Sequence, residues 1–326
     1  MKRTIAIVAG GDSSEFPVSL RSAQGLYSFM DKEKYTVYIV EMKGLCWEAV
    51  LPDGNKTAVD RNDFSFLLNG EKIIFDFAYI IIHGTPGENG LLQGYFDLLH
   101  IPYSTCDVLA SALTFNKFAL NHYLQGFGIR ISDSLLVRKG SDISDQDVIE
   151  KIGLPCFIKP NEGGSSFGVT KVKTAEQIRP AIEKAMHESD EVMVEAFMAG
   201  TEITCGCYKT RTKEVVFPIT EVVSKNEFFD YAAKYDGESQ EITPARLDDD
   251  TTRRVKTLTS AIYDILGCEG IIRVDYIITE GGKINLLEVN TTPGMTATSF
   301  IPQQVRAAGL DMKDVLTDII ENKFIS

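Results

Sequence analysis

The 326-residue sequence lacks several features that mark broad classes of protein. No apolar run reaches the roughly 18 residues that a membrane-spanning helix needs, so we expect no membrane segment and no membrane partner. Basic residues are in the minority, because 33 Lys and Arg stand against 46 Asp and Glu. The resulting net charge of −13 argues against general binding of nucleic acid. The six cysteines lie in apolar contexts, which favours free buried thiols in a reducing cytoplasm over disulfides.

Two common phosphate-binding motifs are also missing. No GxGxxG follows the first predicted strand at 4–9, and no GxxxxGK[ST] opens a helix. A phosphate site must therefore use local lysines and backbone amides. The candidate is the loop 161–168 (NEGGSSFG) between two predicted strands, which could form an anion-binding nest or be an ordinary flexible hairpin loop. Lys159, which ends the preceding apolar strand, favours the nest because a lysine on the buried side needs an anion.

The remaining composition is that of an ordinary globular protein with two or three domains. A strand at 4–9, a glycine turn and a helix at 17–30 predict a doubly wound parallel-sheet α/β domain at the amino terminus. Further strands are expected at 35–42 and 77–83. The second of these ends in His83, at the strand end where such folds bind ligands, although a lone histidine is more often structural.

The stretch 271–295 carries the strongest local signal. It reads as two apolar strands joined by Gly281-Gly282, a pair typical of a two-residue β-hairpin turn. With that turn, Glu280 would face Lys283. The same register would set Asp275 opposite Glu288.

This register also sets Arg273 opposite Asn290 and brings four polar groups to one face. Two facing carboxylates repel each other unless a proton or a cation lies between them. The all-oxygen set of Asp275, Glu288 and Asn290 suits Mg²⁺ or Mn²⁺. The alternative is a solvated polar face, but the apolar neighbours on both strands favour burial. The hairpin therefore predicts half of a metal–nucleotide site.

Two other stretches have properties of a binding site. Glu195 and Glu202 flank a turn between two predicted strands, in a place suited to hydrogen-bond a base and a ribose. The segment 224–246 has no clear periodicity, mixes charges with aromatic residues and is long for a compact domain, which predicts a lid or binding loop.

Four motifs in order resemble those of the D-alanine–D-alanine ligases, which belong to the ATP-grasp superfamily. They are Gly10-Gly11-Asp12-Ser13-Ser14-Glu15, His83-Gly-x-x-Gly-Glu-Asn-Gly90, Lys159-Pro160 with Glu162-Gly-Gly-Ser-Ser-x-Gly168, and Arg273-x-Asp275 with Leu287-Glu-Val-Asn-Thr-Thr-Pro-Gly-Met-Thr296. The resemblance covers nearly the whole chain. It implies an amino-terminal substrate-binding domain at 1–105, a central ATP-grasp subdomain at 106–194, and a carboxy-terminal subdomain at 195–326 with the metal site and the lid (224–246).

The resemblance also implies a reaction. ATP would phosphorylate the carboxylate of one D-alanine, and the amine of a second would attack the acylphosphate, which releases ADP and phosphate and supplies peptidoglycan synthesis. The expected enzyme is a cytoplasmic homodimer that uses two Mg²⁺ or Mn²⁺ ions. The alternatives are a D-alanine–D-serine or D-alanine–D-lactate ligase, another ATP-grasp ligase, or a catalytically silent nucleotide-binding protein. Tyr235 favours an amine as the second substrate, because D-lactate ligases typically replace it.

The residue roles implied by the resemblance fall into five groups. The metal ligands would be Asp275, Glu288 and Asn290. The nucleotide contacts would be Lys117, Lys159, Ser166, Glu195, Phe197, Met198, Glu202 and Lys234. The oxyanion stabilisers would be Arg273 and the Gly294 amide. The amino-acid substrates would contact Glu15, His83, Arg273, Gly294, Ser299 and Phe300. A hydrogen-bonded set that ties the lid to the amino-terminal domain would be Glu15, Ser165 and Tyr235.

Three positions depart from the family pattern. Asn89 stands where many members have Asp, Phe229 where many have Tyr, and Ala196 where many have Lys. The change at Ala196 removes a polar contact expected near the base.

Overall fold

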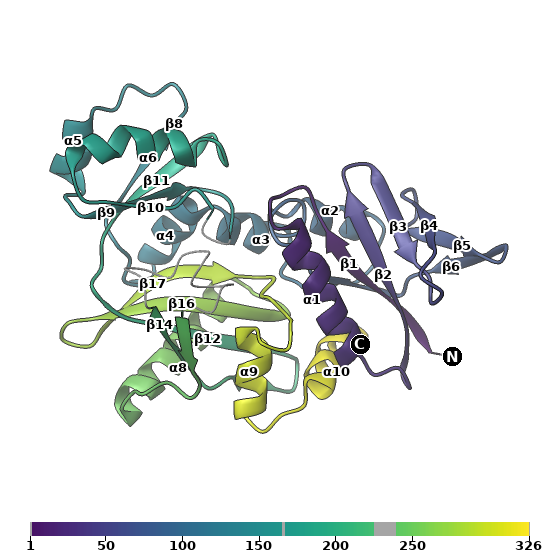
Figure 1. The fold of residues 1–326 in the computed structure, drawn as a ribbon. Helices are drawn as coiled ribbons and strands as arrows, with labels where there is room; N and C mark the ends of the chain where they lie inside the picture. The colour runs from purple at the N-terminus through teal and green to yellow at the C-terminus, as the bar shows by residue number, and fades with distance from the viewer. Residues whose placement is uncertain (1, 165–166, 225–238, 326) are drawn as a thin grey trace.

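The computed structural model of the protein describes residues 2–164, 167–224 and 239–325. Three β-sheets follow one another along the chain, each with helices packed against it (Figure 1). Among the described residues, no helix is both long enough and apolar enough to cross a bilayer. All six cysteines are free thiols, five of them buried and Cys46 exposed.

The amino-terminal sheet mixes parallel and antiparallel strands. Its order is β6-β5-β4-β3-β2-β1-β7. The parallel part consists of β1 (Arg3–Gly10), β2 (Tyr35–Lys43) and β7 (Phe77–Ile80). The antiparallel part is a meander of β3 (Cys46–Val50), β4 (Lys56–Asp60), β5 (Ser65–Leu68) and β6 (Glu71–Ile74). The predicted α/β class is confirmed, but these four short, half-exposed strands were not predicted.

Both faces of this sheet are covered. On one face lies α1 (Phe16–Phe29), which packs on Ile5 and Ile7 of β1. On the other lies α2 (Leu91–Leu98), whose Phe96 is buried in the same cluster as Ala6 and Val8. Successive β1 residues therefore belong to different cores, which explains the unbroken apolar run in its sequence. Residues 101–104 form only one isolated bridge, between Ala78 and Tyr103, and no strand.

The central sheet is small and antiparallel. Its order is β10-β9-β11-β8. The strands are β8 (Ser134–Arg138), β9 (Cys156–Pro160), β10 (Thr170–Val172) and β11 (Glu191–Ala196). The helices packed with it are α5 (Asp145–Lys151), the 3₁₀ turn Ala175–Gln177 and α6 (Ile178–Ala185). The preceding helices α3 (Val108–Phe115) and α4 (Lys117–Gln125) contribute buried residues to the core of the carboxy-terminal sheet instead. One face of the sheet packs on α6, and the other face is free to border a cavity.

The carboxy-terminal sheet has the order β15-β14-β12-β16-β17, with β13 paired to β12. Its strands are β12 (Gly200–Lys209), β13 (Glu214–Val216), β14 (Thr220–Ser224), β15 (Ser239–Ile242), β16 (Ile271–Thr279) and β17 (Lys283–Asn290). Helix α8 (Asp249–Ile265) covers one face. Between 214 and 224 the chain forms two separate strands, β13 and β14. The expected lack of regular structure in 224–246 is wrong at β15, and residues 225–238 lie outside the described residues.

The last two helices return to the amino-terminal domain. Figure 1 shows α9 (Phe300–Ala307) and α10 (Met312–Asn322) beside α1, and the three helices share one apolar core. Glu321 of α10 accepts hydrogen bonds from Arg3 (2.9 and 2.8 Å) and from the Tyr35 hydroxyl (2.7 Å). The chain's end is thus fixed to its beginning. The domain boundaries at 105/106 and 194/195 remain a prediction.

Candidate active site

The hairpin of β16 and β17 places the predicted polar residues together, but through a different turn. Asp275 lies opposite Glu288, and Arg273 lies opposite Asn290, as the sequence predicts. At the turn, however, Thr279 and not Glu280 lies opposite Lys283. The loop therefore has three residues, Glu280, Gly281 and Gly282, and the predicted two-residue turn is wrong.

A β-bulge at Leu287 accounts for both results. Tyr276 pairs with Leu286 and Asp275 pairs with Glu288, so Leu287 is an extra residue in β17. The bulge shifts the register by one residue, which offsets the one-residue shift that the longer turn introduces. It also changes which side chains share a face. Leu286 is fully buried in the core, while Leu287 and Glu288 both line the cavity above the sheet.

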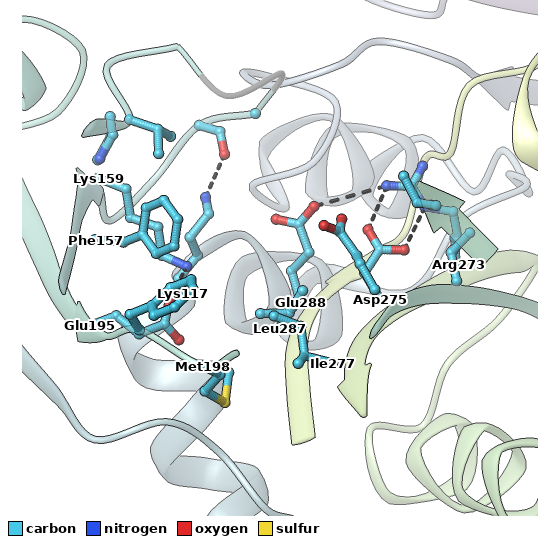
Figure 2. A pocket seen from close by; sticks show the side chains of 18 of the residues that line it. Lys117, Phe157, Lys159, Glu195, Met198, Arg273, Asp275, Ile277, Leu287 and Glu288 are labelled. Atoms are coloured by element: carbon cyan, nitrogen blue, oxygen red, sulfur yellow. Dashed lines mark hydrogen bonds and ion pairs between the residues drawn. The ribbon is translucent and has the colours of Figure 1, made fainter. Parts of the chain in front are cut away.

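Arg273 organises the polar groups of the hairpin (Figure 2). Its Nε and Nη2 donate to the two oxygens of Asp275 at 2.9 and 2.8 Å, and Nη2 lies 3.9 Å from Glu288 Oε1. Asn290 Nδ2 donates to Asp275 Oδ2 (3.1 Å) and to Glu288 Oε1 (3.4 Å). Burial lowers the pKa of the Arg273 guanidinium, but the charges of Asp275 and Glu288 outweigh burial and hold it above its ordinary value.

The donor set fits a hard divalent cation. Asp275, Glu288 and Asn290 offer carboxylate and amide oxygens from facing strands, which are ligands that Mg²⁺ and Mn²⁺ prefer. The described residues contain no cluster of three or more His, Cys, Asp and Glu arranged to hold a metal. A cation here would thus complete its shell with water and with a ligand's phosphates, as Mg²⁺ usually does.

A cavity of about 250 Å³ lies between the central and carboxy-terminal sheets. Its apolar walls include Phe157, Met198, Ile277 and Leu287. Figure 2 shows Lys117, Lys159 and Glu195 on one side of this space and Glu288, Asp275 and Arg273 on the other. Other predicted nucleotide contacts that line it are Phe197 and Glu202.

The alternation of the central strands explains this lining. On β9, Phe157 and Lys159 face the cavity, while Ile158 is fully buried against α6. Glu195 on β11 shares the cavity face, and Lys159 Nζ donates to its Oε2 at 2.6 Å. The other oxygen of Glu195 is buried and has no hydrogen-bond partner among the described residues. A buried acceptor of this kind suits a ligand that donates a hydrogen bond.

Lys117 approaches the same space from the start of α4. Its Nζ donates to the Gly163 carbonyl at 2.5 Å, which ties the helix to the loop at 161–168. Burial lowers the pKa of Lys117, while the charge of Glu288 opposes that shift. Gly163, Gly164 and Phe167 of this loop line the same cavity as Lys117 and Lys159, and the anion-binding nest stays a prediction.

A second cavity of about 390 Å³ lies between the amino-terminal and carboxy-terminal parts. Among the predicted substrate residues, its lining includes Glu15, His83, Arg273, Gly294, Ser299 and Phe300. The two cavities meet, because Gly164, Arg273, Glu288 and Phe300 line both. Arg273 and Glu288 thus lie at the junction of the two cavities.

His83 is buried between elements of distant parts of the chain. Its Nε2 lies 3.3 Å from the Ser22 hydroxyl of α1. Burial lowers the pKa of His83, with Glu15 opposing the shift, so the imidazole is neutral at pH 7. A buried ring that contacts α1 fits a structural role, and its contact with the first substrate stays a prediction.

Glu88 also lines this cavity and was not predicted as a site residue. It accepts the Gly84 N–H at 2.7 Å. Burial and the neighbouring Glu15 carboxylate raise its pKa to about 7. The sequence could have indicated Glu88 as a site residue, because it belongs to the motif at 83–90 and lies between Gly87 and Gly90.

Four predicted site residues lie outside the described residues: Ser165, Ser166, Lys234 and Tyr235. Phe229 also lies outside them. Asn89 hydrogen-bonds the Thr85 hydroxyl (3.1 Å) within its own loop. The Ala196 backbone bonds to Asp133 and Ser132, and its side chain is not part of the cavity lining.

Two family models match the chain. One, described as "D-ala D-ala ligase N-terminus", matches residues 4–106, and the other, "D-ala D-ala ligase C-terminus", matches residues 123–321. Among curated proteins, a D-alanine–D-alanine ligase of Phocaeicola vulgatus is 80% identical over 324 residues, which cover 99% of this chain and 100% of the relative.

Solved structures resemble the whole chain as well. A D-Ala:D-Ser ligase from Enterococcus faecalis has a TM-score of 0.87 at 31% identity and covers 99% of both chains. A D-alanine–D-alanine ligase from Bacillus anthracis, complexed with ATP, has a TM-score of 0.78 at 28% identity and covers 99% of this chain and 97% of its own.

Proposed function

The chain belongs to the D-alanine–D-alanine ligase family, and on that premise we propose that it joins two D-alanines with ATP through an acylphosphate. The products are D-alanyl-D-alanine, ADP and phosphate, and the dipeptide serves peptidoglycan synthesis. One observation carries the proposal at the residue level. Arg273, paired with Asp275 and near Glu288, stands where a cavity with two lysines meets a cavity with Glu15 and Ser299.

The first cavity is proposed to hold ATP. Phe157, Met198 and Leu287 would enclose the base, and the free oxygen of Glu195 would accept a hydrogen bond from its amino group. Lys117 and Lys159 would neutralise phosphate charge. Ser166, Phe197, Glu202 and Lys234 complete the proposed nucleotide set. Asp275, Glu288 and Asn290 would hold two Mg²⁺ or Mn²⁺ ions, which neutralise charge on the phosphates when bound.

The second cavity is proposed to hold the two amino acids. Glu15 would accept the ammonium of the first, beside the buried His83. Ser299, at the start of α9, and Phe300 would border the carboxylate end of the second. Arg273 and the Gly294 N–H would stabilise the negative charge that develops on the attacked carboxyl group. Glu15, Ser165 and Tyr235 would link the 224–246 segment to the amino-terminal domain.

The proposed reaction has two chemical steps. The first carboxylate attacks the γ-phosphorus, and ADP leaves with the bond's electron pair. The neutral amine of the second D-alanine adds to the acylphosphate carbon, loses its proton, and phosphate departs. Arg273 suits both steps because it borders both cavities and keeps its positive charge at any working pH. Exclusion of water from the acylphosphate prevents its hydrolysis.

A D-serine as second substrate is the closest alternative, since one similar structure is named a D-Ala:D-Ser ligase. It is not favoured, because that structure shares 31% identity with this chain and the D-alanine–D-alanine ligase of P. vulgatus shares 80%. A D-lactate ligase is disfavoured by Tyr235 in the sequence.

We further propose a cytoplasmic homodimer with domains at 1–105, 106–194 and 195–326. The exposed apolar side chains of α2 and α3 support a second copy as the partner, because Leu91, Leu98 and Leu109 are 63%, 83% and 74% exposed on neighbouring helices. Sedimentation velocity tests this, and a monomer at micromolar concentration would contradict it.

The activity is tested by phosphate release with ATP, Mg²⁺ and a panel of D- and L-amino acids. We expect release only with D-alanine, with dipeptide formed in equal amount. Glu288→Gln keeps the shape of the side chain and removes its charge, so turnover should fall by orders of magnitude while the fold stays intact. Near-normal turnover of that variant would remove Glu288 from the proposed metal site. If none of the D-amino acids in the panel supports phosphate release, the proposed function is wrong.

A further inference from the structure

Thr204 of β12 carries a buried hydroxyl for which the described residues offer no hydrogen-bond partner. The residue is 2% exposed, and its Oγ1 has no hydrogen-bond partner among the described residues. Its side chain lines the cavity that we assign to the nucleotide. Buried hydroxyl groups are nearly always paired, so this one needs a specific explanation.

The strand's alternation fixes the direction of the side chain. Ile203 and Cys205, on either side of Thr204, are fully buried in the core beneath α8. Glu202, two residues earlier, lines the cavity as Thr204 does. Thr204 therefore faces the ligand space and not the core.

Neighbouring polar groups are already paired with one another. Gln304 of α9 is fully buried and donates to the Thr204 carbonyl and to the Thr220 hydroxyl, each at 3.1 Å. Its Oε1 accepts the Gly206 N–H at 2.9 Å. Among the described residues, this network holds the β12 backbone but does not include the Thr204 hydroxyl.

The register places that hydroxyl beside the proposed metal ligands. Thr204 lies directly opposite Asp275, while Glu202 lies opposite Ile277. Both oxygens of Asp275 already accept hydrogen bonds from Arg273, and one also accepts from Asn290. The hydroxyl is thus a donor at the phosphate end of the cavity, next to a carboxylate whose oxygens are already engaged.

We propose that Thr204 is a nucleotide-binding residue whose hydroxyl donates a hydrogen bond to the phosphate side of the bound nucleotide. The inference rests on the proposed function and deepens it. Without nucleotide the buried hydroxyl lowers the stability of the fold, because valine would fill the same space without burying a polar group. With nucleotide bound, the hydroxyl has a partner. Its removal should therefore have opposite effects on stability and on binding.

The test combines Thr204→Val with two other variants. Binding of ADP with Mg²⁺ is measured by calorimetry, and thermal unfolding is measured without ligand. Thr204→Val should raise the Kd of ADP by about threefold to tenfold, the range expected for one hydrogen bond, and should leave the unfolding temperature equal or higher. Thr204→Ser keeps the donor and should bind ADP with a Kd close to that of the wild type.

Thr259→Val is the matched control. Thr259 is also fully buried, but its hydroxyl donates to Val255 O (3.0 Å) and lies 2.9 Å from the Tyr276 hydroxyl, away from the cavity lining. This variant should lower the unfolding temperature and leave the Kd of ADP unchanged. We thus expect the same Thr→Val change to affect ADP binding at one position and stability at the other.

Three results would overturn the inference. One is an unchanged Kd of ADP in Thr204→Val, and another is a lower unfolding temperature without ligand, since the hydroxyl would then serve the fold. The third is equal weakening of adenosine binding, which would place the hydroxyl at the ribose. If the wild type itself binds no ADP, the proposed function fails first, so the two failures are distinguishable.

Discussion

Substitution of Gly25 tests how the amino-terminal domain shapes the second-substrate site. Gly25 lies inside α1, where glycine is less favourable than alanine by about 0.5–1 kcal/mol. A Cβ at this position would lie 2.2 Å from the Met295 carbonyl oxygen and 3.1 Å from Thr296 Cα. These are backbone atoms, so no side-chain rotation relieves the contact. The separation must widen from 2.2 Å towards the 3.4 Å at which ordinary contact begins.

The backbone that must move carries the proposed second-substrate contacts. Gly294 directly precedes Met295, and the Thr296 N–H donates to Ser299 Oγ at 3.1 Å. An overpacked contact costs about 1–3 kcal/mol, and the gain of about 0.5–1 kcal/mol in helix propensity reduces this to a net loss of about 0–2.5 kcal/mol. A shift of about 1 Å at a reacting site costs up to about 10²-fold in rate. We therefore expect Gly25→Ala to lower kcat/KM for the second D-alanine by about 10–100-fold.

The assay is steady-state phosphate release with D-alanine varied at saturating ATP, and then with ATP varied. The KM for ATP should change little, because Met295 and Thr296 are not part of the nucleotide cavity lining. Gly94→Ala in α2 is the control, since its Cβ would meet only Val108 Cγ2 at 3.7 Å, an ordinary contact. That variant should keep full activity and gain up to about 1 kcal/mol of stability. If Gly25→Ala behaves like Gly94→Ala, the close packing of α1 does not position the loop.

Two other predictions concern pH and substrate choice. Burial and Glu15 raise the pKa of Glu88 from 4.5 to about 7, so the folded state holds this proton more tightly than the unfolded chain. The stability from the protonated carboxyl is therefore complete below about pH 4.5 and is lost as pH rises through about 7. Glu88→Gln should reduce the pH dependence of the free energy of unfolding, measured in urea without ligand. An unchanged pH dependence would contradict the raised pKa of Glu88. Tyr235→Phe removes a hydroxyl worth about 0.5–1.5 kcal/mol per hydrogen bond, so dipeptide synthesis should fall modestly and D-lactate use should rise. An unchanged product ratio in a competition between D-alanine and D-lactate would show that Tyr235 does not govern the choice.

The sequence by itself determined the features that depend on local alternation. The alternation in β16 predicted that Arg273 and Asp275 share a face, and the alternation in β17 predicted the same of Glu288 and Asn290; both pairs do so in the fold. The same holds for Lys159, which shares the cavity face of β9 with its neighbour two residues earlier. These predictions succeed because side-chain direction in a strand has a period of two and needs no knowledge of distant residues.

Features that depend on register or on distant packing were decided only by the tertiary structure. The bulge at Leu287 cannot be recognised in a run of apolar letters, because two adjacent leucines fit either face until the partner strand fixes them. The meander of β3–β6 has short, half-exposed strands whose pattern is weak. In both cases the stabilising contacts come from a neighbouring strand and not from the segment itself.

The partners of individual side chains were likewise hidden from the sequence. Gly25 is a poor helix residue by propensity until α1 packs on Met295, and Thr204 is an ordinary strand residue until its hydroxyl is found without a partner among the described residues. The raised pKa of Glu88 arises from burial beside Glu15, 73 positions earlier in the chain. Chain folding brings such groups together, and their chemistry depends on that proximity.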